Sequence, residues 1–163
     1  MDKKKERSKA DKVLRRFAKE VKALGFIRTK PSFFTREKGA VIEFIHIHKY
    51  TFGPYFRMHF CFRVLNDPKE FISLSGLTEK ELAEEGSFDF GEDLASVEQC
   101  AKNMGAFVLQ YAEPWFTSFE NADRLLSESS PLYEEEKAAL KSAIAGGSVK
   151  ANEQRSRAEL GIA

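Results

Sequence analysis

The chain has few of the residues and patterns that mark specialised protein classes. Its two cysteines, Cys61 and Cys100, are too few for the disulfide framework of a small secreted protein. No apolar run approaches the length of about 18 residues that spans a membrane. The charged start Met1–Glu6 holds no apolar stretch of the signal-peptide type. We therefore expect a soluble protein of the cytoplasm.

Sequence patterns of common catalytic sites are also missing. The chain has no glycine-rich phosphate loop, no C-x-x-C pair, no H-E-x-x-H and no G-x-S-x-G. Acidic pairs such as Glu84-Glu85 and Glu92-Asp93 fall at expected turns and helix starts, where capping explains them. We therefore predict no catalytic residues and no cofactor, which favours a protein that is not an enzyme.

What the chain does have is the composition of a globular domain. Hydrophobic residues make up 42% and charged residues 31% of the 163 residues. Many of the 15 phenylalanines cluster between Phe26 and Phe62, which indicates a core-forming sheet in that stretch. We predict one domain over residues 1–147, followed by a C-terminal tail over 148–163 that is either frayed or docked.

The net charge of +1 hides a strong asymmetry. Residues 1–30 carry 12 Lys/Arg against 4 Asp/Glu, whereas residues 66–136 carry 4 against 17. Such a split is typical of a nucleic-acid arm, of an acidic binding face, or of two halves that attract each other. Solvated helix faces that partly neutralise each other are the commonest explanation.

Residues 8–24 carry one apolar stripe at spacings of three and four, which predicts an amphipathic helix. We expect Ser8 to cap this helix and Gly25 to end it. Three strands follow, at Phe26–Arg36, Val41–Tyr50 and Tyr55–Val64. Pro31 interrupts the first strand, which favours an edge position or a bulge, and turns at Lys38-Gly39 and Gly53-Pro54 join the strands.

The rest of the chain is expected to be mainly helical. Phe71–Leu74 is a candidate short strand, and an acidic helical turn is expected around Leu77–Glu85. One helical pattern runs from Leu94 to Tyr111 and stops at Glu113-Pro114, and a second runs from Pro114 to Leu126. A third begins at Ser130-Pro131, with three glutamates near its positive end, and fades at Gly146-Gly147.

These elements predict an α+β fold: an antiparallel sheet of three to five strands packed against the N-terminal helix and the C-terminal helices. The sheet needs such a helical layer because one of its faces is strongly apolar. We expect five residues in the core, namely Phe17, Phe56, Phe60, Phe62 and Val108.

All three histidines fall on the other face of this sheet. Side chains alternate along a strand, so the apolar positions Phe56, Phe60 and Phe62 share one face, and His46, His48 and His59 share the opposite one. A register that pairs position 46 with position 59 would bring their Cβ atoms to about 5 Å. Tyr50, Tyr55, Arg57 and Arg63 lie on the same face. We predict a binding surface that consists of His46, His48, Tyr50, Tyr55, Arg57 and His59.

Three histidines in this pattern can also form a metal site with an open position for water, as in the zinc site of carbonic anhydrases. Against this, Arg57 and Arg63 would repel a dication, and that face offers no evident carboxylate to orient the imidazoles. We therefore predict no bound metal. A pocket for an anion or a nucleotide, with the arginines and histidines as donors, is a further alternative.

Several segments share an arrangement with a known bacterial family. They are Leu24-Gly25-Phe26, Ser32-Phe33-Phe34, Ile42–Tyr50, Gly53-Pro54-Tyr55-Phe56 and Pro114-Trp115-Phe116 with the run to Leu126. This arrangement, over residues 8–128, resembles the domain-of-unknown-function family catalogued as 4304. His46–Tyr50 departs from that family, which tends to carry a glutamine-lysine-serine-like end there. The resemblance implies an α+β fold and no assigned activity.

Three functions fit these observations. The first is a non-enzymatic bacterial interaction protein, such as an immunity or antitoxin-like partner of a toxin, because an acidic surface suits a basic partner. The second is a small-ligand or metal-binding domain, a hydrolase included, that uses the His/Arg face. The third is a nucleic-acid accessory protein that uses the basic N-terminal arm. A pI of about 7.7 lacks the strongly basic character of nucleic-acid binders, so the expected partner is a protein, not a nucleic acid or a membrane.

Overall fold

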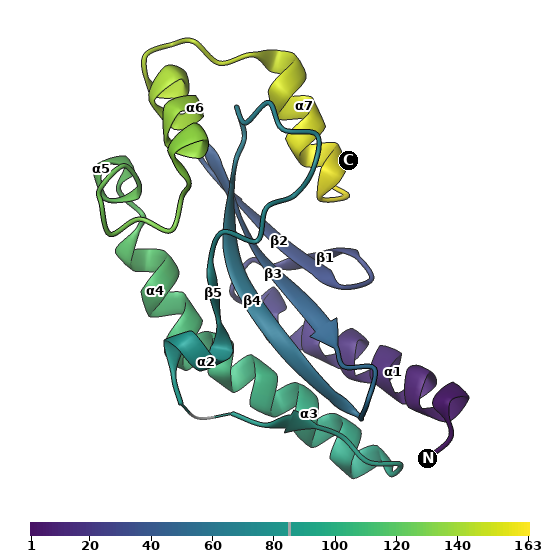
Figure 1. Cartoon of the computed structure of the whole chain (residues 1–163). Coiled ribbons are helices and arrows are strands. Elements are labelled where there is room, and N and C mark those ends of the chain that lie inside the picture. Colours follow the sequence, from purple (N-terminus) through teal and green to yellow (C-terminus); the bar gives the residue numbers. More distant parts are fainter. Residues whose placement is uncertain (85) are drawn as a thin grey trace.

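The computed structural model describes residues 1–84 and 86–163 and has the predicted α+β architecture (Figure 1). The described residues form seven α-helices: α1 Lys3–Lys22, α2 Glu79–Leu82, α3 Leu94–Phe107, α4 Glu113–Ser118, α5 Ala122–Leu125, α6 Glu134–Ile144 and α7 Lys150–Glu159. They form six strands: β1 Ile27–Lys30, β2 Phe33–Lys38, β3 Val41–Lys49, β4 Tyr55–Val64, β5 Leu77–Thr78 and β6 Phe88–Asp89. None of the described helices is long and apolar enough to cross a membrane.

The strands form one antiparallel sheet in the order β1-β2-β3-β4-β5; β5 pairs with the middle of β4, and β6 pairs with its first two residues. Its six strands are one more than the predicted maximum, because β5 and β6 are pairs of residues too short to stand out as a sequence pattern. The strand predicted at Phe71–Leu74 does not form; β5 begins at Leu77 instead. The strand predicted at Phe26–Arg36 is two strands, which a turn at Pro31-Ser32 separates.

The register between β3 and β4 pairs His46 with His59, which is one of the registers that the alternation of residues allows. The first face of the sheet therefore carries Ile45, Ile47 and the even-numbered residues of β4, and α1, α3 and α4 pack on it. All five predicted core residues are buried: Phe17, Phe56, Phe60, Phe62 and Val108. The alternation of apolar residues along two strands was thus enough to predict which face of the sheet is buried under the helices.

Helix α1 begins five residues before the position predicted for it. The carboxylate of Asp2 accepts a hydrogen bond from the backbone N–H of Lys5 at 2.9 Å, so Asp2 caps the helix, and Ser8 does not. The prediction failed because the apolar stripe starts only at Ala10, and a helix can extend beyond its stripe. At the other end Gly25 has a φ of 91°, the left-handed conformation that ends helices, as predicted.

The predicted helix break at Glu113-Pro114 does not occur. Helix α3 continues through a π-helical segment, Val108–Ala112, directly into α4. The backbone N–H of Glu113 bonds to the carbonyl of Val108, five residues earlier, and Pro114, which has no N–H, falls in the first turn of α4. The wider turn accommodates the proline without breaking the helix. The second predicted helix is instead divided into α4 and α5.

A buried ion cluster interrupts the apolar first face. Arg36 donates from Nε to Glu43 at 2.7 Å and from Nη1 to Glu113 at 3.0 Å, and its guanidinium lies 4.1 Å from the ring centre of Phe26. Burial raises the pKa of Glu43, and the charge of Arg36 opposes this rise. The cluster ties α4 to strands β2 and β3.

One end of the second sheet face is covered by α7 and by the segment 65–76. Leu160 is fully buried there against an apolar cluster of Ile42, Phe44, Cys61 and Leu65. The segment 148–163, which is helical over α7, is therefore docked on the sheet.

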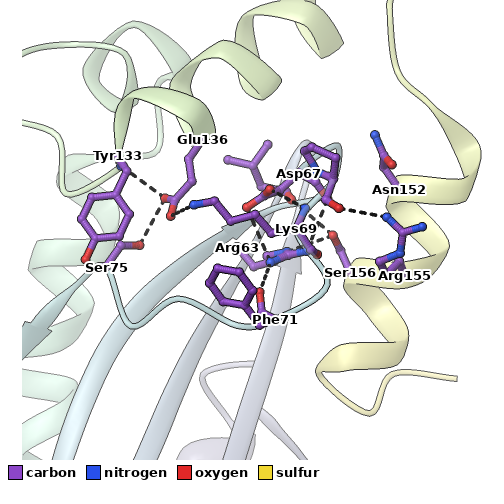
Figure 2. Close-up of polar contacts among 12 residues, drawn as sticks. Arg63, Asp67, Lys69, Phe71, Ser75, Tyr133, Glu136, Asn152, Arg155 and Ser156 are labelled. Atoms are coloured by element: carbon purple, nitrogen blue, oxygen red, sulfur yellow. Dashed lines mark hydrogen bonds and ion pairs between the residues drawn. The ribbon is translucent and has the colours of Figure 1, made fainter.

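Arg63 holds this layer together and is itself 3% exposed. It donates to Ser156 Oγ of α7 at 3.0 Å and to the carbonyls of Phe71 and Lys69, each at 2.7 Å (Figure 2). An ion pair of 3.5 Å with Asp67 neutralises its charge. The expectation that Arg63 lies beside the histidines is thus wrong: it shares their face but lies at the covered end.

Candidate functional site

The other end of the second face carries all six predicted binding residues. We call this surface the His/Tyr/Arg patch; it consists of His46, His48, Tyr50, Tyr55, Arg57 and His59. Strand pairing sets His46 opposite His59 and His48 opposite Arg57. His48 is exposed and Tyr55 is 38% exposed, whereas the other four side chains are half-buried. Because they rise from two adjacent strands, they form a surface and not a deep pocket.

Tyr50 lies at the centre of the aromatic contacts in the patch. Its ring centre is 4.8 Å from that of Tyr55 and 5.6 Å from that of His48, and the guanidinium of Arg57 lies 5.6 Å from it. Tyr50 and Tyr55 face each other because the backbone N–H of Tyr50 bonds to the carbonyl of Tyr55 across the turn. Each ring restricts the next, so these side chains are ordered before any partner arrives.

Glu79 of α2 is a further member of the site that the sequence argument missed. Its side chain is 4% exposed, it accepts the backbone N–H of Met58 at 2.9 Å, and it lies 3.9 Å from Nε of Arg57. Burial raises the pKa of Glu79, while its hydrogen bonds and the charge of Arg57 lower it. The Thr78–Glu81 capping box is a signal that could have located the start of this short helix.

The surroundings of His46 and His59 favour the neutral form of each imidazole. Burial lowers the pKa of His46, and the neighbouring His59 and His48 lower it further. Burial is also the main cause of the lowered pKa of His59, followed by the charge of Arg57, while Glu81 acts in the opposite direction. The ring of His46 packs 4.7 Å from that of Phe33, and its buried Nδ1 has no hydrogen-bond partner among the described residues.

Two carboxylates that the sequence did not reveal lie near the histidines, but among the described residues neither hydrogen-bonds to an imidazole. Glu79 and Glu81 approach from α2, which two-strand parity could not reveal. Even so, no group of three or more His, Cys, Asp or Glu side chains in the described part of the chain has an arrangement that could hold a metal ion. Arg57 lies opposite His48 on the neighbouring strand, and its charge, which acts on His59 as well, would oppose a dication. The prediction that the protein binds no metal stays a prediction.

A polar cavity of about 210 Å³ lies beside the patch, between the start of α1 and the end of β3. The lining residues are Lys3, Glu6, Arg7, Lys49, Tyr50 and Thr51. The ammonium of Lys49 pairs with Glu6 there, so part of the positive charge is already neutralised. This cavity shares only Tyr50 with the patch.

The comparison with family models finds no match for this chain, and neither a curated protein nor a solved structure matches it. The resemblance to family 4304 therefore stays a prediction that concerns the fold, and it assigns no role to the patch.

Proposed function

We propose that the chain is a non-enzymatic protein-binding domain and that the His/Tyr/Arg patch is the centre of its interface. The main support for this proposal is that α7 and the segment 65–76 cover one end of the second sheet face, while exposed His48 and Tyr55 lie at the other end. An immunity or antitoxin-like protein is the form of this function that we favour, because the acidic half of the chain suits a basic partner.

The chemistry of the patch supports a protein partner. Interface cores are enriched in tyrosine and arginine and depleted in lysine and glutamate, and the patch has two tyrosines and one arginine with no lysine. Arg57 lies 5.6 Å from the ring centre of Tyr50 and 3.9 Å from Glu79, and these neighbours reduce the side-chain entropy that a partner must remove when it binds. Tyr55 and Arg57 are therefore the expected energetic anchors.

A comparative capture experiment tests this function. The wild-type protein, a Tyr55→Ala/Arg57→Ala variant and a control variant are immobilised and exposed to the lysate of the native host. The control is Phe71→Ala/Arg124→Ala, which removes an exposed aromatic side chain and an exposed cation elsewhere. We expect a protein that the wild type and the control retain and the patch variant loses. Retention by all three folded proteins would contradict the proposal.

The metal-binding alternative has its own measurement. We expect elemental analysis of the purified protein to find no stoichiometric zinc, because Arg57 lies next to the histidines. About one zinc per chain, lost in the His46→Ala variant, would instead make a metal-dependent function the better proposal.

A further inference from the structure

Helix α1 carries a straight row of cations along its outer side. Over Lys3–Lys22 it has ten Lys/Arg against three Asp/Glu. The residues buried against the sheet are Ala10, Val13, Phe17 and Val21. The side diametrically opposite carries six basic residues, which we call the cation row: Lys4, Lys5, Lys12, Arg15, Lys19 and Lys22. At about 100° per residue they fall within roughly 50° of one line along the helix, and all six are exposed.

The remainder of the protein does not neutralise this row. The three acidic residues of α1 lie off the row: Glu6 pairs with Lys49, Asp11 pairs with Arg15 and Arg28, and Glu20 lies against Gly105 of α3. The carboxylates of Glu92 and Glu98 pair with the N-terminal amine and with Arg16, which lie beside the row. Among the ion pairs of the described residues, five of the six row members take no part; Arg15 is the exception.

The overall pI of about 7.7 argued against a nucleic-acid partner, but it averages over a chain whose positive charge is concentrated on α1. We propose that the cation row binds the phosphate backbone of duplex nucleic acid without sequence preference. A helix of 20 residues is about 30 Å long, and a duplex presents one negative charge per about 1.7 Å of its axis. A straight row of exposed lysines therefore meets several phosphates at once and releases their counterions. Early Asp2 capping matters here, because it makes Lys4 and Lys5 helical and aligns them with the row.

Two other polyanionic partners fit the row less well. A membrane-surface helix inserts an apolar face between lipids, but the apolar face of α1 is buried in the core, with Val13, Phe17 and Val21 fully covered. A protein interface centres on tryptophan, tyrosine or arginine anchors, whereas the row has five lysines and one arginine, Arg15, which already pairs with Asp11. The row also lies on the side of the sheet opposite the His/Tyr/Arg patch, so the two surfaces are independent.

Fluorescence anisotropy tests the proposal. The probe is a labelled duplex DNA of about 20 base pairs and mixed sequence, and its affinity is measured at KCl concentrations from about 50 to 200 mM. We expect a dissociation constant of about 1 to 100 µM at physiological salt and a slope of log K against log[salt] near −4 to −5. The row variant Lys12→Gln/Lys19→Gln/Lys22→Gln should flatten that slope by about 2 to 3 and weaken binding at least tenfold at low salt.

The matched control is Lys38→Gln/Lys141→Gln/Lys150→Gln, which removes the same charge from exposed lysines outside α1. It should keep most of the wild-type affinity, and so should Tyr55→Ala/Arg57→Ala, which separates this test from that of the protein interface. Equal losses in both lysine variants, or no binding at low salt, would overturn the proposal. Binding to phosphatidylserine vesicles through the same lysines, without binding to the duplex, would overturn it as well.

Discussion

At the scale of single residues, His46 and His59 link the patch to pH. Their pKa values lie below the ordinary 6.5 in the folded chain, mainly because of burial, so the unfolded chain takes up protons first as the pH falls. Above about pH 6.5 both histidines are neutral in the unfolded chain as well, and their full contribution to the free energy of unfolding is present. Below that pH the unfolded chain binds protons more readily than the folded chain, so the free energy of unfolding decreases until the folded histidines are protonated too.

The buried carboxyls of Glu43, Glu79 and Glu136 have raised pKa values, so the folded chain protonates them before the unfolded chain does. Their effect on the free energy of unfolding as the pH falls is therefore opposite to that of the histidines. A variant comparison separates the two effects. Urea unfolding at about pH 7.5 and about pH 5.5 should show a larger loss of stability on acidification for the wild type than for His46→Gln/His59→Gln. An identical pH dependence of the two proteins would show that these imidazoles titrate normally.

Residue alternation predicted a specific part of the site. It grouped all six patch residues on one face, because side-chain parity within two paired strands is a local property, and it allowed the register that pairs His46 with His59 without selecting it. It could not show how far α7 covers that face, so Arg63 was assigned to the wrong end. It also could not show Glu79, which reaches the patch from a helix of four residues outside the two strands.

At the scale of elements, α7 is the part of the fold that the sequence left open. Its side chains are mostly polar, so no apolar stripe predicted a docked helix. Its contact with the sheet depends on a few buried groups, notably Leu160 and Ser156. Both contact residues that lie far away in the sequence. Similarly, the uninterrupted passage from α3 to α4 depends on a π-helical turn that hydrophobic spacing does not encode.

The docking of α7 can be measured with one substitution. Leu160→Ala removes a fully buried side chain from the cluster around Phe44 and should reduce the free energy of unfolding by about 2 to 5 kcal/mol. Ile144→Ala, at the exposed end of α6, should change it by no more than about 0.5 kcal/mol. Urea denaturation of both variants provides the comparison. If Leu160→Ala is as stable as Ile144→Ala, the tail is not docked in solution.

At the scale of the whole molecule, charge is divided between the basic start and the acidic helical half. Part of this division is neutralised inside the fold, since Arg16 pairs with Glu98 at 3.0 Å and the terminal amine with Glu92 at 3.4 Å. Each pair contributes little to stability, because Glu92 is 61% exposed and both partners of the Arg16–Glu98 pair are more than a third exposed. What remains is a long-range field with opposite signs on different parts of the surface, which affects association more than folding.

That field predicts the kinetic role of the acidic stretch 79–98. Glu84 is exposed within it, whereas Glu85 lies outside the described residues. Replacing both glutamates with glutamine should slow association with a basic partner several-fold at low salt. The difference should disappear near about 1 M salt, where the screening length is about 3 Å. Stopped-flow association rates at the two salt concentrations check this; an unchanged rate at low salt would mean that this stretch does not steer the encounter.

The dissociation rate of the complex with the captured partner tests the central claim most directly. Surface plasmon resonance should show faster dissociation of Tyr55→Ala and of Arg57→Ala, equivalent to a loss of about 1 to 3 kcal/mol for each, because these side chains are the expected anchors. Phe71→Ala, which removes an exposed ring elsewhere, should dissociate like the wild type. If both patch variants are folded and dissociate at the wild-type rate, the His/Tyr/Arg patch is not the interface.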